Sequence, residues 1–333
     1  MADHGENSTE HVQAKVKIAT FLSGGLSASG YVGGIVLVIL SALIIAAGGQ
    51  SARTLGFTMV MSAVYILIFM CAYAKLSYQR TAQPLPRGAN LLTFGYVRIA
   101  KTVRQVRRLK TMFFYLCMWF ILGDGLTSMT SMAVLIAKDQ LKATNSALII
   151  VALIQYVCAG LGMWFWIWLQ NNKGVKPKTV IIINSCLFGL IPVYCLLGLI
   201  KGVSIGMKQT WEMYMLAAFF GLFIGAIGAT NRVIFAMFIP LGHENELYAL
   251  FEMVNTTSSW IGPLICAAII ESAGIRQIWW FLATQFFIPA AMLFYVDVEK
   301  GRQDAIEFYK NEQKEKEGTQ VEEIHDEKDV KLV

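Results

Sequence analysis

An aspartate, an arginine and a glutamate stand inside apolar stretches of this sequence. Asp124 lies in FILGDGLTSMT, about twelve residues into an apolar run that begins near Met112. In a helix this distance is roughly 18 Å, close to the centre of a bilayer. An ionised carboxylate costs at least about 2.5 kcal/mol at that depth, so it must face protein or water. We expect either a substrate or proton site, or a buried hydrogen bond between helices. Gly123 and Gly125 leave room for a helix or a substrate to approach it.

A second polar cluster occurs in ATNRVIFAMFIPLGHENELYALFEMVNTTSSWIGPL. Arg232 and Glu252 lie at similar distances from the turn between two apolar stretches, which places both roughly 12 Å deep on adjacent antiparallel helices. Asn231 adjoins the arginine, and Asn255 lies one turn from Glu252 on the same face. Opposite charges at matched depth are expected to pair. The pair would be either a gate near the cytosolic side or a fixed structural ion pair, and a buried pair alone does not decide between them.

The elements that carry these residues are predicted to be membrane-spanning helices. Of the 333 residues, 56% are hydrophobic and only 15% are charged, whereas soluble domains are nearer a quarter charged. Apolar stretches of the length that crosses a bilayer predict an all-α polytopic membrane protein with about eight spans. The predicted spans are residues 27–48, 54–75, 112–137, 145–169, 179–200, 211–239, 246–273 and 277–297. In the sixth of them, Gly221, Gly225 and Gly228 predict close helix packing, in preference to a substrate path.

The charged residues set the predicted organisation. Residues 1–26 are expected to be a cytosolic N-terminal segment, residues 27–75 two spans, residues 76–111 a basic amphipathic cytosolic linker, residues 112–298 a six-helix unit and residues 299–333 a disordered cytosolic tail. Lys and Arg concentrate in the links after the second and fourth spans, which predicts that both termini are cytosolic. The basic linker is expected to lie on the anionic leaflet of the bilayer, with a partner site as the alternative.

Several function classes lack support. The six cysteines fall inside apolar runs and the four histidines show no metal-ligand spacing, so no metal or other cofactor is expected. No Walker loop, HExxH or nucleophile elbow is present, which argues against an enzyme or an ATP-driven pump. Nucleic acid is not an expected partner of a chain with so many spans. The oligomeric state cannot be predicted from the sequence.

Four stretches resemble known transporters. LQNNKGVKPKTV is similar to the cytosolic loop motif of the major facilitator superfamily, with Asn172 at the usual acidic position. FILGDGLTSMTSMAVLIAK, SASGYVGG and NRVIFAMFIPLGHENELYALFEMVNTTSSWIGPL resemble the fungal autophagy-related vacuolar amino-acid effluxers of the autophagy-related protein 22 type. The resemblance extends over most of residues 20–300. It implies a major-facilitator-like bundle with a partial first half, lacking about four spans, and a complete six-helix second half.

The resemblance also implies a function. A member of this family would export amino acids, such as leucine and other neutral ones, across the vacuole membrane to the cytosol, with protons as a candidate driving ion. Asp124 would then be a midplane polar or proton-carrying group, and Asn231, Arg232, Glu252 and Asn255 would form a gate or a contact to the substrate carboxylate. The alternatives are a facilitator for another small solute and a membrane assembly or regulatory protein that does not transport.

Overall fold

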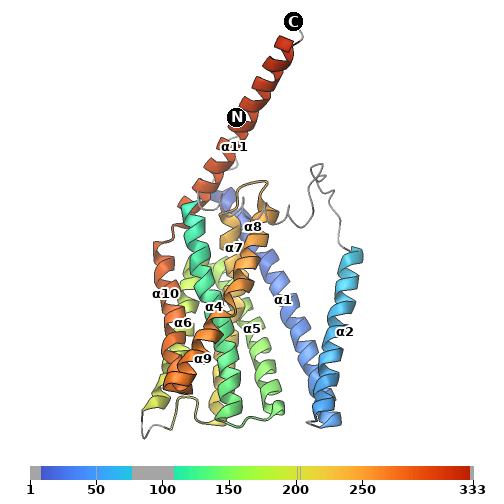
Figure 1. Ribbon diagram of the computed structural model, residues 1–333, viewed down its shortest axis with the longest axis vertical. Helices are drawn as coiled ribbons and strands as arrows, with labels where there is room; N and C mark the ends of the chain where they lie inside the picture. Colours follow the sequence, from blue (N-terminus) through green and yellow to red (C-terminus); the bar gives the residue numbers. More distant parts are fainter. Residues whose placement is uncertain (1–8, 50, 77–108, 201, 203, 331–333) are drawn as a thin grey trace.

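A computed structural model describes residues 9–49, 51–76, 109–200, 202 and 204–330, and these contain helices and no strands (Figure 1). The α-helices are α1 (Thr9–Gly48), α2 (Ala52–Leu76), α4 (Lys110–Asp139), α5 (Asn145–Lys173), α6 (Pro177–Leu196), α7 (Thr210–Met237), α8 (Glu244–Ser258), α9 (Ile261–Ala273), α10 (Ile278–Tyr295) and α11 (Val298–Val330). Short 3₁₀ turns, η1 (Leu197–Leu199) and η2 (Ile275–Gln277), precede α7 and α10.

The prediction of an all-α polytopic membrane protein is confirmed. Within the described residues, eight candidate spans are long and apolar enough to cross a membrane. They run from residue 18 to 48, 52 to 76, 110 to 139, 145 to 173, 177 to 199, 210 to 237, 244 to 273 and 275 to 295. The first helix begins at Thr9, well inside the segment that was expected to precede the membrane. The sequence there is rich in Ala, Lys, Glu and Gln, which favour helix.

The core lies among helices α4 to α10, and α1 packs along α5 and α7. Figure 1 shows α2 standing apart from this bundle, beyond α1. Ser23 on α1 donates a hydrogen bond to the carbonyl of Ala229 on α7, with an O–O distance of 2.8 Å. Tyr31 on α1 and Tyr156 on α5 place their ring centroids 6.5 Å apart. The contacts of α1 with the six-helix unit therefore involve both polar and aromatic groups.

Helices α5 and α7 approach backbone to backbone through glycines. A Cβ atom added to Gly225 would lie 2.1 Å from the carbonyl oxygen of Ala159, and one added to Gly221 would lie 2.4 Å from that of Gln155. On the facing helix, a Cβ at Gly162 would lie 2.0 Å from the Leu222 oxygen. These distances confirm close helix packing at Gly221 and Gly225. The same prediction is wrong at Gly228, where an added Cβ would meet no atom within 4 Å.

The seventh predicted span is broken into two helices. Helix α8 ends at Ser258 and α9 begins at Ile261, although the sequence predicted one continuous span over residues 246–273. Pro263 accounts for the break, because its ring would clash with the carbonyl of Ser259 in a continuous helix and it has no N–H to donate. The break also leaves the N–H of Gly262, in the first turn of α9, without a partner inside the helix.

The α5–α6 link is joined to the end of α10. Gly174 ends α5 with a φ of +65°, a left-handed conformation that glycine adopts readily. Lys178, in the first turn of α6, donates from Nζ to the carbonyls of Phe294 at 3.1 Å and Val296 at 2.6 Å. A lysine of the facilitator-like segment thus binds the last carbonyls of a neighbouring span, where the negative end of the helix dipole lies.

The C-terminal segment differs from the expected disorder, since α11 runs from Val298 to Val330. Its first turns pack on the bundle, where Thr111 donates to Asp304 at 3.0 Å and a ring nitrogen of His243 lies 2.8 Å from a Glu312 oxygen. Composition alone could not foresee these contacts. The predicted basic linker, residues 76–111, lies almost wholly outside the described residues.

Candidate functional site

Asp124 lies in the middle of α4 and is buried, with 3% of its surface exposed. Its Oδ1 accepts a hydrogen bond from the N–H of Gly262 at 2.9 Å. Its Oδ2 accepts a second bond from Nε2 of Gln285, on α10, at 2.5 Å. The carboxylate therefore sits at the broken point of the seventh span and supplies the partner that the first turn of α9 lacks. A carboxylate is favoured there because the N-terminus of a helix carries partial positive charge.

Glycines allow this approach. A Cβ at Gly125 would lie 3.0 Å from the Cβ of Gln285, and a Cβ at Gly123 would lie 3.2 Å from Oδ1 of Asn255. On the opposite side, a Cβ at Gly262 would lie 1.9 Å from Oγ of Ser128. The glycines beside Asp124 thus bring helices α8 and α10 against α4, as the sequence indicated for a neighbouring helix.

Several buried polar atoms around Asp124 have no hydrogen-bond partner. They are Oγ of Ser128, Oε1 of Gln285 and Nε1 of Trp119. Buried polar groups are nearly always bonded, so these unpaired atoms are unusual. Ser128 and Gln285 lie at the contact between Asp124 and Gly262, and the Trp119 ring lies near Gly123. Ser128 and Gln285 thus each have an unpaired polar atom beside the carboxylate.

Asn231 and Arg232 lie on α7 in different surroundings. Asn231 is buried, and its Oδ1 accepts a short hydrogen bond from the hydroxyl of Tyr115 on α4. Arg232 is half-buried, and its Nη1 is buried without a hydrogen-bond partner. The guanidinium of Arg232 therefore has an unused donor inside the bundle.

The predicted pairing of Arg232 with Glu252 does not occur: within the described residues, no ion pair joins them. Glu252 is exposed on α8. Its neighbour Phe251 stacks on Phe235 of α7, with ring centroids 4.5 Å apart. Successive residues of a helix point about 100° apart, so the helix face that turns Phe251 toward α7 turns Glu252 away.

The structure thus separates the five residues that the sequence singled out. Asn255 joins the surroundings of Asp124 through its approach to Gly123, whereas Asn231 bonds Tyr115. Sequence reasoning missed Gln285, which is buried and binds Asp124 directly. Its signal was present, because it is a lone amide in the middle of the apolar stretch FLATQFFIPA.

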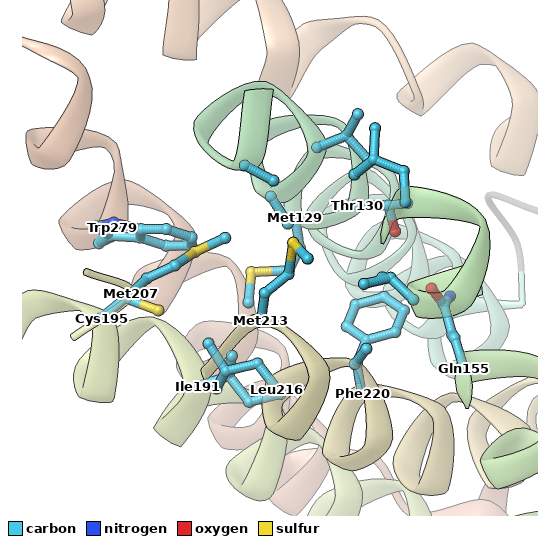
Figure 2. A pocket seen from close by; sticks show the side chains of 16 residues that line it. Met129, Thr130, Gln155, Ile191, Cys195, Met207, Met213, Leu216, Phe220 and Trp279 are labelled. Carbon is cyan, nitrogen blue, oxygen red and sulfur yellow. The ribbon is translucent and has the colours of Figure 1, made fainter. Parts of the chain in front are cut away.

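Sequence reasoning also missed an apolar cavity of about 70 Å³ between α4, α5, α6, α7 and α10 (Figure 2). Met129, Ile191, Met213, Phe220 and Trp279 provide much of its wall. Figure 2 shows Thr130 and Gln155 at one end, and Met207, Cys195 and Trp279 at the other. A cavity of this kind accepts an apolar group and offers few polar contacts.

An all-helical bundle with eight candidate spans among the described residues, and with a buried carboxylate at a broken span, defines a polytopic membrane protein. The family described as "Vacuole effluxer Atg22 like" matches residues 2–306, and the chain belongs to this family.

Curated fungal relatives agree with this assignment. Autophagy-related protein 22 of Coccidioides immitis is 31% identical over 319 residues, which are 92% of this chain and 53% of the relative. Autophagy-related protein 22-1 of Penicillium rubens is 30% identical over 304 residues, or 88% of this chain and 51% of the relative. The same protein of Aspergillus niger is 28% identical over 321 residues, 93% of this chain and 52% of the relative. The chain spans about half the length of these relatives.

Proposed function

We propose that this chain acts in a vacuole-membrane transporter that exports amino acids, leucine and other neutral ones, from the lumen to the cytosol after autophagic breakdown. The family supports transport at the vacuole, and the apolar cavity supports an apolar side chain in the substrate. The observation that carries the proposal is the carboxylate of Asp124, held by Gly262 and Gln285 where the seventh span is broken.

In this proposal, Asp124 takes up and releases a proton near the bilayer centre. Protonation would weaken its bond to Gly262, since hydrogen bonds to an ionised acceptor are about twice as strong as neutral ones. Helix α8 would then be freer to move relative to α9. The proton gradient of an acidic lumen would be coupled to movement of the cytosolic half of this span.

The unused donor of Arg232 supports a role in binding the substrate carboxylate, with Asn231 fixed beside it by Tyr115. Glu252 and Asn255 lie on α8 and would act in the cytosolic gate that this helix forms when it moves. The orientation with both termini in the cytosol is supported by the distribution of Lys and Arg in the links between spans.

Leucine efflux from isolated vacuoles that carry the chain tests the proposal. We expect Asp124→Asn and Arg232→Ala each to lower the initial efflux rate at least about tenfold at equal protein level. The matched control is Glu271→Gln, which removes an exposed charge from α9 and should leave efflux unchanged. Unchanged efflux in both site variants would contradict these roles. Competition by unlabelled sugars, peptides and amino acids separates the proposed substrate from another small solute.

A second candidate is a membrane assembly or regulatory partner that does not transport. Proteoliposomes that contain this chain alone distinguish the two. Leucine efflux from them supports the transporter. No efflux, together with copurification of a second membrane protein from vacuoles, supports the partner.

A further inference from the structure

A strained loop lines one end of the apolar cavity. We define the plug loop as residues 204–209, which connect η1 to α7. Met207 in this loop has a φ of +61°, a left-handed conformation that side-chain-bearing residues seldom adopt. Its side chain is buried and lines the cavity beside Trp279 and Cys195 (Figure 2). The bulky side chain of Met207 thus lies at the cavity end although its backbone conformation is unfavourable.

A buried carboxylate holds this loop in place. Glu212, in the first turn of α7, is completely buried. Its Oε2 accepts a short hydrogen bond from the N–H of Met207 and a second from the N–H of Lys208 at 3.3 Å. Its Oε1 is buried and has no hydrogen-bond partner. Both backbone N–H groups that this carboxylate accepts from belong to the plug loop, and the hydroxyl of Tyr194 on α6 is a further neighbour of the carboxylate.

Two further contacts fix the loop to its surroundings. Arg276 donates from Nη1 to the carbonyl of Gly206 at 3.1 Å. Gly206 itself lies against η1, where an added Cβ would be 2.2 Å from the nitrogen of Gly198. The titratable and charged groups around Glu212 and the loop are Tyr194 and Cys195 on α6, Arg276 in η2 and Lys208 in the loop.

We propose that the protonation state of Glu212 controls whether the plug loop stays in place at the cavity end. The ionised carboxylate holds Met207 in the cavity end, and the neutral acid holds it less firmly because the bonds from the two N–H groups lose their charge assistance. The left-handed conformation of Met207 then favours release. Figure 1 places this end of the bundle opposite α11, which is the luminal side in the orientation proposed above. Acid in the lumen would open the cavity toward the lumen.

Cys195 reports this opening without an added probe residue, because it lines the cavity and is buried. The experiment uses the full chain in detergent with the other five cysteines replaced by alanine. It measures the rate of modification by N-ethylmaleimide at pH 7.4 and expresses this rate per thiolate, because the Glu212 charge also acts directly on the Cys195 thiol. At this fixed pH, Glu212→Gln imitates the protonated acid. We expect it to raise the rate at Cys195 at least about tenfold, while Glu271→Gln leaves the rate within about twofold.

A second background retains only Cys266, which is also buried but lies outside the cavity wall. Its rate should not respond to Glu212→Gln. Equal rates at Cys195 for Glu212→Gln and Glu271→Gln would overturn the proposal, because the plug loop would then not be released. Equal acceleration at Cys195 and Cys266 would also overturn it, because the whole bundle would then be loosened.

The unaltered chain provides an independent measurement, which does not depend on whether a Glu212 variant folds. Hydrogen exchange of the plug-loop amides, corrected for the intrinsic effect of pH, should increase about tenfold or more between pH 7.4 and pH 5.0. The Glu212→Gln chain should show no further increase. Equal hydrogen exchange of the plug-loop amides at both pH values in the unaltered chain would refute this control by Glu212. Neither measurement depends on transport, so failure of the proposal for Glu212 is distinguishable from failure of the proposed function.

Discussion

The carboxylate of Asp124 accepts a hydrogen bond from the backbone N–H of Gly262, 138 residues further along the chain. The bond crosses from the middle of α4 to the first turn of α9 and satisfies a donor that the helix break leaves unpaired. An ionisable residue that lipid would reject is thus accommodated by the backbone of a neighbouring span.

The space around Gly262 leads to the first prediction. In Gly262→Ala, the new Cβ would lie within 3 Å of Oγ of Ser128 and both carboxylate oxygens of Asp124. We expect a loss of about 1–3 kcal/mol in stability from overpacking. Thermal unfolding in detergent, followed by tryptophan fluorescence, measures the change. Adding Ser128→Ala removes the nearest atom and should restore part of the loss; an unchanged midpoint in Gly262→Ala would show that the site is not tightly packed.

The contact between α5 and α7 gives a prediction with an internal control. Gly225→Ala places a Cβ about 2 Å from the backbone carbonyl of Ala159, which cannot move aside as a flexible side chain could. We expect a lower unfolding temperature for this variant. Gly228→Ala, one turn further along the same helix, meets no atom within 4 Å and should be neutral or slightly stabilising. Equal effects at both positions would contradict the packing described here.

Lys178 is expected to stabilise the junction of α6 and α10. Lys178→Met keeps most of the side-chain volume but removes the donor to the carbonyls of Phe294 and Val296. The expected loss is about 1.5–3 kcal/mol, the usual range for hydrogen bonds made by a charged group. Lys176→Met is the matched control, since Lys176 is exposed two residues earlier in the same link. Denaturant unfolding in detergent should separate the two variants.

The separation of Arg232 from Glu252 predicts that the two residues are energetically independent. In a double-mutant cycle with Arg232→Ala and Glu252→Ala, the stability changes should add to within about 0.5 kcal/mol. Tyr115→Phe and Asn231→Ala provide the positive comparison, because their side chains share a hydrogen bond and should show coupling. A coupling of about 2 kcal/mol between Arg232 and Glu252 would reveal an ion pair that the structure does not contain.

Hydropathy was sufficient to predict the eight spans and the burial of Asp124, because the free energy of placing apolar and charged groups in lipid dominates both. Matched depth was not sufficient to predict the partner of Arg232. Depth fixes position along a helix, but the direction of a side chain depends on which neighbouring residues pack, and here Phe251 determines the face that α8 turns toward α7.

Contacts between distant residues were also beyond the sequence. The bonds of Asp124 to Gly262 and Gln285 connect segments that are 138 and 161 residues apart, and only the folded bundle brings them together. The helix break, by contrast, had a local signal in Pro263, whose effect on the preceding turn follows from its ring and its missing N–H.

The glycine contacts between α5 and α7 have a mechanical consequence. With carbonyl groups of each helix seated where the other lacks side chains, the two cannot slide or rotate past each other without steric collision. They must travel as a single rigid body in any rearrangement of the bundle. The interrupted seventh span is where such a rearrangement would find a place to bend, because residues 259 and 260 separate α8 from α9.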